Sequence, residues 1–132
     1  MAAVIWHSEI RSYTLSQSGW DTDIRAVFPD WQTDAAAERW PEIRASLSVG
    51  QTATGSVISR APFGVWLDIG VNQPALLLVV NMDGANTRRI AFEDYPEKGT
   101  ELTARINALG DRGEIGLTQQ NPDMMIEGKE AK

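Results

Sequence analysis

The chain has 132 residues, of which 42% are hydrophobic and 23% are charged, a composition typical of a globular domain. This length suits one domain, or one domain with an extension, and can bury a core without disulfides or metals. The net charge of −6 is unlike that of proteins that hold nucleic acid chiefly by neutralising its phosphates. No segment is basic: residues 1–49 contain seven acidic and four basic residues, and residues 50–119 contain eight and six.

Residue counts exclude several kinds of site. Without cysteine there is no disulfide, thiolate zinc site or cysteine nucleophile, and the single histidine, His7, cannot form a multi-histidine metal site. The longest apolar run, 75–80, is far shorter than the ~20 residues of a membrane-spanning helix. The first residues lack the pattern of a signal peptide. We therefore expect a cytoplasmic protein with no membrane association, no metal and no cofactor.

The N-terminal third is unusually rich in tryptophan. Four of the five tryptophans lie there, with Tyr13 and Phe28, and disordered segments are poor in such residues. We expect this region to fold, or to fold against something. Asp34 is a plausible N-cap, the alanine-rich residues 35–39 favour helix and Gly50 is a natural terminator. The pattern predicts one broken helix, or two short ones, over 34–48.

From Gly50 onwards the sequence is typical of β structure. Residues that favour strands, separated by glycine-containing turns, predict five short strands. These are residues 51–60, 64–70, 76–80, 101–109 and 114–119. A loop-rich segment, 81–100, separates the third strand from the fourth. The turn at 110–113 joins the last two strands as a hairpin.

Five short strands of this kind predict a mainly β fold, and the OB fold is the five-stranded barrel that closes its edges. The predicted organisation is an N-terminal, partly helical extension over 1–48 that packs on the barrel, a barrel domain over 49–119 and a flexible tail over 120–132. The tail is polar and contains Pro122, Gly128 and terminal lysines. We find no internal repeat.

Four short motifs lie in order along the predicted barrel. They are Val49-Gly50-Gln51 with Gly55-Ser56-Val57, Phe63 to Gly70, Lys98 to Ile106, and Asp111 to Thr118. Segment 49–118 thereby resembles the S1 RNA-binding domain, a branch of the OB fold, which shows VGxxxxGxV, FGxFVxL, GxxVxxxV and RGRIxLS at similar spacing. Residues 1–48 match no family that we can name. The resemblance implies an S1-like barrel and an RNA ligand.

S1 domains that bind RNA use two aromatic residues, a histidine and basic or polar neighbours as a platform. Phe63 and Trp66 occupy the two aromatic positions, and the resemblance implies that they stack on bases, at ~1–3 kcal/mol for each base. The alternative is that both pack against the N-terminal segment.

Three other platform positions depart from the S1 pattern. Leu78 falls where the histidine lies, and Gly110 falls where an acidic residue often precedes the turn. Glu114 replaces the arginine of the last motif, so an anion stands where a cation would face phosphate. These departures weaken the expectation of RNA binding at the usual site.

The third predicted strand is apolar on both faces. Leu76, Leu78 and Val80 share one face, and Leu77 and Val79 share the other, because strand side chains alternate. A barrel strand needs only its inner face apolar, so the outer face is predicted to be covered. The tryptophan-rich extension or a protein partner would provide that cover, and the extension would then occlude the usual place of RNA.

Arginines supply the remaining candidate contacts. The candidate RNA-binding residues are therefore Phe63, Trp66, Arg60, Arg88, Arg89 and Arg105. The arginines at 88 and 89 lie in the long loop from which OB folds commonly build part of a cleft. The alternative is that these arginines are simply solvated. We expect no catalytic residues, because the chain lacks phosphate-binding glycine motifs and metal-ligand spacing and its adjacent acids are typical of solvated surface.

Two functions remain open. The first is an RNA-binding or single-stranded nucleic-acid-binding module with weak, stacking-led affinity. The second is a protein interaction module on an S1 scaffold, such as an adaptor, a regulatory subunit or an acidic inhibitor of a basic enzyme, with a basic protein as partner. The S1 resemblance, which is the most specific signal in the sequence, favours the first. The acidic balance, the apolar third strand and the aromatic extension favour the second. The position of the extension relative to Phe63 and Trp66 discriminates between them.

Overall fold

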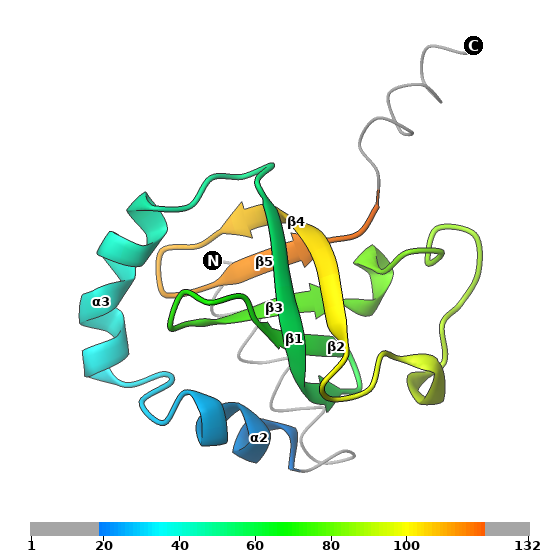
Figure 1. Cartoon of the computed structure of the whole chain (residues 1–132), viewed down its shortest axis with the longest axis horizontal. Coiled ribbons are helices and arrows are strands. Elements are labelled where there is room, and N and C mark those ends of the chain that lie inside the picture. Colours follow the sequence, from blue (N-terminus) through cyan, green and yellow to red (C-terminus); the bar gives the residue numbers. More distant parts are fainter. Residues whose placement is uncertain (1–18, 121–132) are drawn as a thin grey trace.

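A closed barrel of five short strands forms the centre of the molecule (Figure 1). The structure, a computed structural model, describes residues 19–120. The strands are β1 (Thr52–Ala61), β2 (Gly64–Asp68), β3 (Pro74–Leu78), β4 (Glu101–Leu109) and β5 (Ile115–Thr118). Around the barrel they follow the order β1-β2-β3-β5-β4. All neighbouring pairs are antiparallel except β3 and β5, which pair in parallel.

The predicted strands are all present, but their ends differ. The third strand begins at Pro74 and ends at Leu78, and the chain then turns through the short 3₁₀ helix η1 (Val79–Asn81). The prediction of 76–80 was therefore displaced, because the apolar run continues beyond the point where the strand ends. A second 3₁₀ helix, η2 (Phe92–Asp94), interrupts the long segment before β4.

Within the described residues, two α-helices precede the barrel and lie along its outside (Figure 1). They are α2 (Trp20–Val27) and α3 (Asp34–Ala45). Helix α3 is continuous through Pro41, so the prediction of a broken helix or two short ones over 34–48 was wrong. Its N-cap is Thr33 rather than Asp34: the Thr33 hydroxyl accepts the Ala36 N–H at 3.4 Å. The predicted C-terminal tail beyond residue 120 lies outside the described residues, as do His7 and Tyr13.

Apolar residues form two separate clusters. The first fills the barrel with inward side chains of all five strands, including Leu67, Leu77 and Ile106. The second lies on the outer face of β2 and β3, beneath α2 and the segment that follows it. Its buried members are Trp20, Ile24, Phe28, Trp31, Ala61, Phe63, Trp66 and Leu76. The described part of the extension is thus packed on the barrel wall, where it covers one face.

Helix α3 is tied to the end of the barrel and to the segment before it. The indole N–H of Trp40 donates to the Gly110 carbonyl at 2.9 Å, across the barrel end. The Arg39 guanidinium donates to both carboxylate oxygens of Asp30, at 2.6 and 2.9 Å. The hydrogen bonds from the Arg39 guanidinium lower the pKa of Asp30 below its ordinary value, and the Asp30 carboxylate raises the pKa of Arg39.

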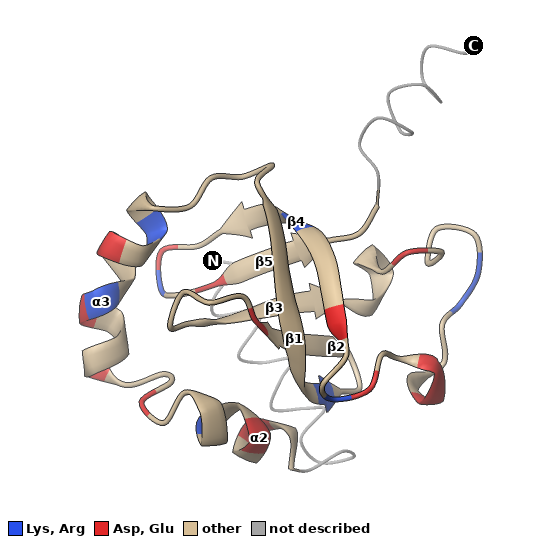
Figure 2. Cartoon of the chain, viewed as in Figure 1, with Lys and Arg blue, Asp and Glu red and all other residues tan. Residues whose placement is uncertain are grey.

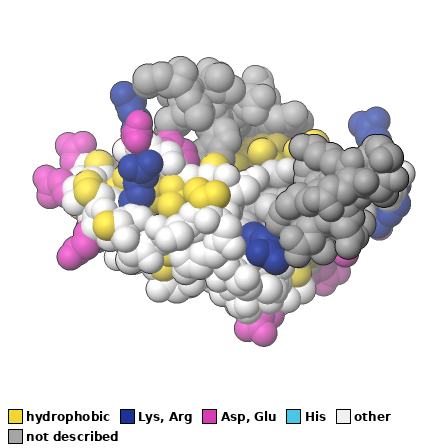
Figure 3. All heavy atoms as spheres, turned by 90° about the horizontal axis from the view of Figure 1, so that it is seen from above, with side chains coloured by type: hydrophobic (Ala, Val, Ile, Leu, Met, Phe, Trp, Pro, Cys, Tyr) yellow, Lys and Arg dark blue, Asp and Glu magenta, His cyan; other side chains and the backbone are white. Residues whose placement is uncertain are grey.

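Charge is distributed unevenly over the fold (Figure 2). Acidic residues concentrate on α2, on α3 and on the segment that carries η2, whereas the strands carry few charges. Figure 3 shows that lysine and arginine side chains on the face seen from above stand apart from one another.

Candidate nucleic-acid interface

The two predicted stacking residues, Phe63 and Trp66, lie inside the outer aromatic cluster. They are 7% and 2% exposed. Trp20 lies parallel to Trp66, with ring centroids 6.3 Å apart, and meets Phe63 edge to face at 5.3 Å. Trp31 approaches Trp66 edge to face at 5.5 Å. The rings that would stack on bases are therefore packed against protein aromatics, which is the alternative that the sequence left open.

This aromatic cover is energetically strong. Each tryptophan buries roughly 150–250 Å², which at about 25 cal/mol per Å² is worth roughly 4–6 kcal/mol. Stacking of a base on a protein ring contributes only ~1–3 kcal/mol. One or two bases therefore cannot displace Trp20 and Trp31 from Phe63 and Trp66.

Polar contacts fix the same cover in place. The buried Ser59 hydroxyl donates to the Trp20 carbonyl at 2.6 Å, which joins β1 to the start of α2. The Lys98 ammonium lies 3.2 Å from the Asp23 carboxylate, which joins α2 to the loop before β4. Helix α2 is thus held at both the barrel wall and a loop.

The departures from the S1 platform have structural roles here. Leu78 packs against the outer cluster, so an apolar side chain replaces the histidine where the face is covered. Glu114 folds back over the β4–β5 turn and accepts the Arg112 N–H at 3.0 Å. A Cβ at position 110 would collide with this carboxylate, so the glycine there leaves room for it. The acidic residue therefore stabilises a turn, a role that its place in the motif does not reveal.

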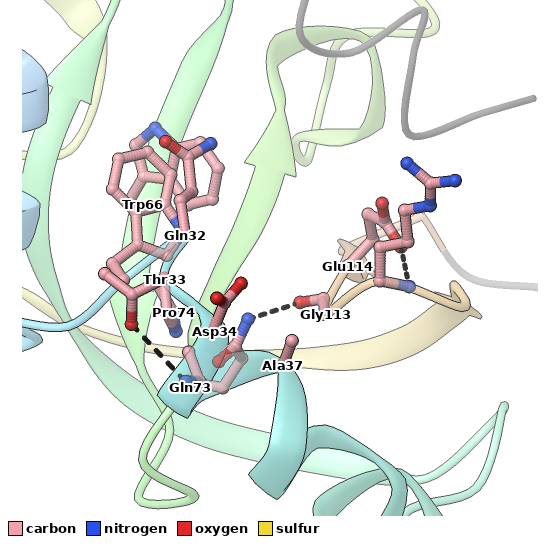
Figure 4. Close-up of a pocket in the computed structure, with 12 residues that line it drawn as sticks. Gln32, Thr33, Asp34, Ala37, Trp66, Gln73, Pro74, Gly113 and Glu114 are labelled. Atoms are coloured by element: carbon pink, nitrogen blue, oxygen red, sulfur yellow. Dashed lines mark hydrogen bonds between the residues drawn. The ribbon is translucent and has the colours of Figure 1, made fainter.

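A small pocket opens beside the cover, between the α2–α3 connection and the barrel end (Figure 4). We call it the acidic pocket; its volume is about 220 Å³. It is lined by Trp31, Gln32, Thr33, Asp34, Ala36, Ala37, Trp66, Gln73, Pro74, Arg112, Gly113 and Glu114. The buried Gln73 amide N–H donates to the Gly113 carbonyl at 2.7 Å. Two carboxylates against one cation, Arg112, leave this pocket with net negative charge and make it a poor place for phosphate.

A larger groove of about 630 Å³ lies between the end of β3 and the loop that follows it. We call it the arginine groove. It is lined by Pro62, Phe63, Leu78, Val79, Val80, Ala85, Arg88, Arg89, Ile90 and Tyr95. Three of the six predicted site residues, Phe63, Arg88 and Arg89, thus meet at one place. The floor is apolar, with Val80 65% exposed, and none of the described lining residues is acidic.

Arg60 supports this groove from behind. Its guanidinium donates to the Phe92 carbonyl at 2.7 Å and lies over the Phe92 ring, 4.7 Å from the centroid. Phe92 in turn packs edge to face on Tyr95, and the Tyr95 hydroxyl donates to the Pro62 carbonyl at 2.7 Å. These contacts tie the loop between β3 and β4 to the β1–β2 hairpin, so Arg60 positions the loop instead of offering a free guanidinium.

Arg105 lies elsewhere, exposed on β4. It faces Thr52 of β1 on one side and Thr118 of β5 on the other. Together with Thr103, Ala104, Gln119 and Gln120, these residues line a shallow hollow of about 270 Å³. We call it the threonine groove.

Sequence reasoning missed several residues that line the two grooves. They are Val80, Tyr95, Gln119 and Gln120, and none of them belongs to a recognisable motif.

Other site types find no support in the part of the chain that the structure describes. Residues 19–120 contain no group of three or more histidine or acidic side chains arranged to hold a metal ion. Within the same range, no helix is both long enough and apolar enough to cross a membrane.

Comparison with known proteins finds distant relatives of part of this chain. No protein-family profile matches the chain. Polyribonucleotide nucleotidyltransferase of Deinococcus deserti is 28% identical over 96 residues, and that of Prochlorococcus marinus is 29% identical over 79 residues. These matches cover 73% and 57% of this chain but only 12% and 11% of those enzymes. The chain therefore resembles a small part of much longer proteins.

Solved structures with a similar fold include GSP13 from Bacillus subtilis, with 18% identity and a TM-score of 0.46 over 65% of this chain and 60% of that one. A chain of the a/eIF2alpha–aDim2p–rRNA complex from Pyrococcus horikoshii has 20% identity and a TM-score of 0.48, over 64% and 55%. The strand order of the barrel and the four ordered motifs define this chain as an S1-like OB-fold domain.

Proposed function

We propose that this protein binds single-stranded nucleic acid, and RNA in particular, at the arginine groove. The observation that carries the proposal is a pair of arginines beside an exposed apolar floor, with no acidic residue among the described lining residues, in a chain of net charge −6. Guanidinium groups suit phosphate because their N–H donors match its oxygens in pairs. The proposal is of binding, without catalysis.

The geometry changes the kind of affinity expected. Because Phe63 and Trp66 are buried and packed against other tryptophans, their rings offer little exposed surface for base stacking. Bases would instead rest on the apolar floor at Leu78 and Val80, while Arg88 and Arg89 meet the phosphates. Such binding is weak and depends on salt. The similarity to proteins named for polyribonucleotides supports RNA over DNA.

A titration of labelled oligouridylate at about 50 mM salt, where weak phosphate contacts are least screened, tests the proposal. Arg88→Gln combined with Arg89→Gln removes both cations of the groove. The matched control is Arg44→Gln, because Arg44 is equally exposed on α3, away from the groove. We expect loss of binding in the double variant and unchanged binding in the control. Equal binding by all three proteins would refute the site.

A second function is favoured by the acidic pocket. The described part of the extension lies over Phe63 and Trp66. This is the arrangement expected either for a protein interaction module or for a nucleic-acid-binding module whose usual platform is covered by its own extension. Asp34 and Glu114 would receive a basic side chain of a partner, with Trp31 and Trp66 beside it. Saturable binding of an arginine-rich peptide that Asp34→Asn abolishes, with no binding of oligouridylate, would support this function in place of the first.

A further inference from the structure

The arginine groove and the threonine groove are neighbours. Gln120 lines the threonine groove, and its side-chain amide donates to the carbonyl of Val80, in the floor of the arginine groove, at 3.0 Å. The two grooves thus meet where the chain leaves β5, beside η1.

The junction is held firmly by further hydrogen bonds. The Gln119 N–H donates to the Asn81 carbonyl at 2.8 Å, and the Gln119 side-chain carbonyl accepts the Asp83 N–H at 3.1 Å. The Thr118 hydroxyl also approaches the Asn81 carbonyl, at 3.5 Å. These hydrogen bonds hold the residues after β5 against the residues after β3. They therefore set the position of one groove relative to the other.

The threonine groove has the chemistry of a backbone contact. It offers the Arg105 guanidinium, hydroxyls from β1, β4 and β5, and glutamine amides, and its described lining residues include no carboxylate. Hydroxyls and guanidinium groups are common partners of phosphate and sugar. Neighbouring strands lie about 4.8 Å apart, so Arg105 on β4 is roughly two strand spacings, about 10 Å, from the chain after β3.

We propose that a single-stranded nucleic acid continues from the arginine groove across Gln120 to the threonine groove, where Arg105 contacts a further phosphate. This inference rests on the proposed function and extends it by a second subsite. OB folds accommodate about 4–16 nucleotides, so a strand that spans both grooves is of ordinary length. The arginine groove alone would then bind short strands, and the threonine groove would add affinity only for strands long enough to reach it.

Length dependence tests this path. Labelled oligouridylates of about three and about nine nucleotides are titrated against the full chain, the Arg105→Gln variant and the Arg44→Gln control. We expect Arg105→Gln to weaken the longer strand about two- to fivefold, the scale of an exposed charge contact, and to leave the shorter one unchanged. Each phosphate contact adds about −0.7 to the slope of log K against log salt for a single strand. The slope for the longer strand should therefore become less steep, from about −2.1 with three contacts to about −1.4 with two.

The possible outcomes separate the two proposals. If the arginine groove binds RNA but Arg105→Gln leaves the longer strand unaffected, the path is overturned and the proposed function stands. If Arg105→Gln weakens both lengths equally, Arg105 acts as a general charge and the path is again overturned. If neither oligonucleotide binds the unaltered protein, the proposed function itself fails. Thermal unfolding of the variant confirms that its fold is intact.

Discussion

Trp20 of the extension lies parallel to Trp66 of the barrel, with 7° between the ring planes and 6.3 Å between the centroids. Trp20 thus lies against Trp66 where the S1 resemblance would place a nucleic-acid base. The S1-like face therefore forms part of a packed aromatic cluster, and the proposed ligand binding lies in the grooves around it.

The aromatic cover is expected to contribute strongly to stability. Trp20→Ala should lower the free energy of unfolding by about 3–5 kcal/mol, the cost of removing a buried aromatic ring. Denaturant unfolding measures this. The control Thr22→Ala lies on the same helix but is exposed, and it should change stability by about 0.5 kcal/mol or less. A loss no larger than that of the control would show that Trp20 is not part of a packed core.

Glu114 is expected to act on the turn and not on RNA. Glu114→Ala removes the acceptor of the Arg112 N–H and should reduce stability by about 1 kcal/mol. Glu114→Gln keeps an oxygen acceptor and should retain most of that stability. Oligonucleotide affinity should be the same in both variants, and a large change in affinity for either would place position 114 in the binding site.

The Asp30–Arg39 pair predicts a dependence of stability on pH. The folded state lowers the pKa of Asp30 below 3.8, so the pair stabilises the protein fully above that pH. The contribution should disappear as pH falls below 3.8 and through the folded-state pKa. Unfolding of the unaltered protein and of Asp30→Asn should therefore differ at pH 6, with a gap that narrows in acid. A gap independent of pH would exclude this ionic role.

Arg60 is expected to position the arginine groove from behind. Arg60→Met removes the hydrogen bond to Phe92 and the cation over its ring. Backbone amide resonances of residues 88–95 should shift, and oligonucleotide affinity should fall about two- to fivefold. Arg44→Met is the control. Weaker binding with unshifted loop resonances would instead make Arg60 a direct contact.

The fold was predictable because its signals are local. β-forming segments, glycine-containing turns and the four ordered motifs each depend on a few neighbouring residues, and the S1-like barrel is confirmed. The apolar character of both faces of the third strand also indicated a cover. In the structure Leu76 belongs to the outer cluster and Leu77 to the barrel core.

The site was less predictable because its contacts join distant parts of the chain. Large aromatic side chains suit both base stacking and a core, so Phe63 and Trp66 alone could not reveal the partners Trp20 and Trp31. Arg60 resembled a free cation until Phe92, 32 residues later, was placed beside it. Both Thr33 and Asp34 are residue types that cap helices, so the sequence could not distinguish them.

Chemical-shift mapping with oligouridylate shows whether RNA binds in the arginine groove while the aromatic cover stays closed. In that case the backbone amides of Val80, Arg88 and Arg89 shift on titration, while the indole N–H resonances of Trp20 and Trp66 stay in place. Large shifts of these two indoles, with the loop amides unmoved, would show that RNA opens the aromatic cover and binds the S1 platform. That result would contradict binding at the arginine groove.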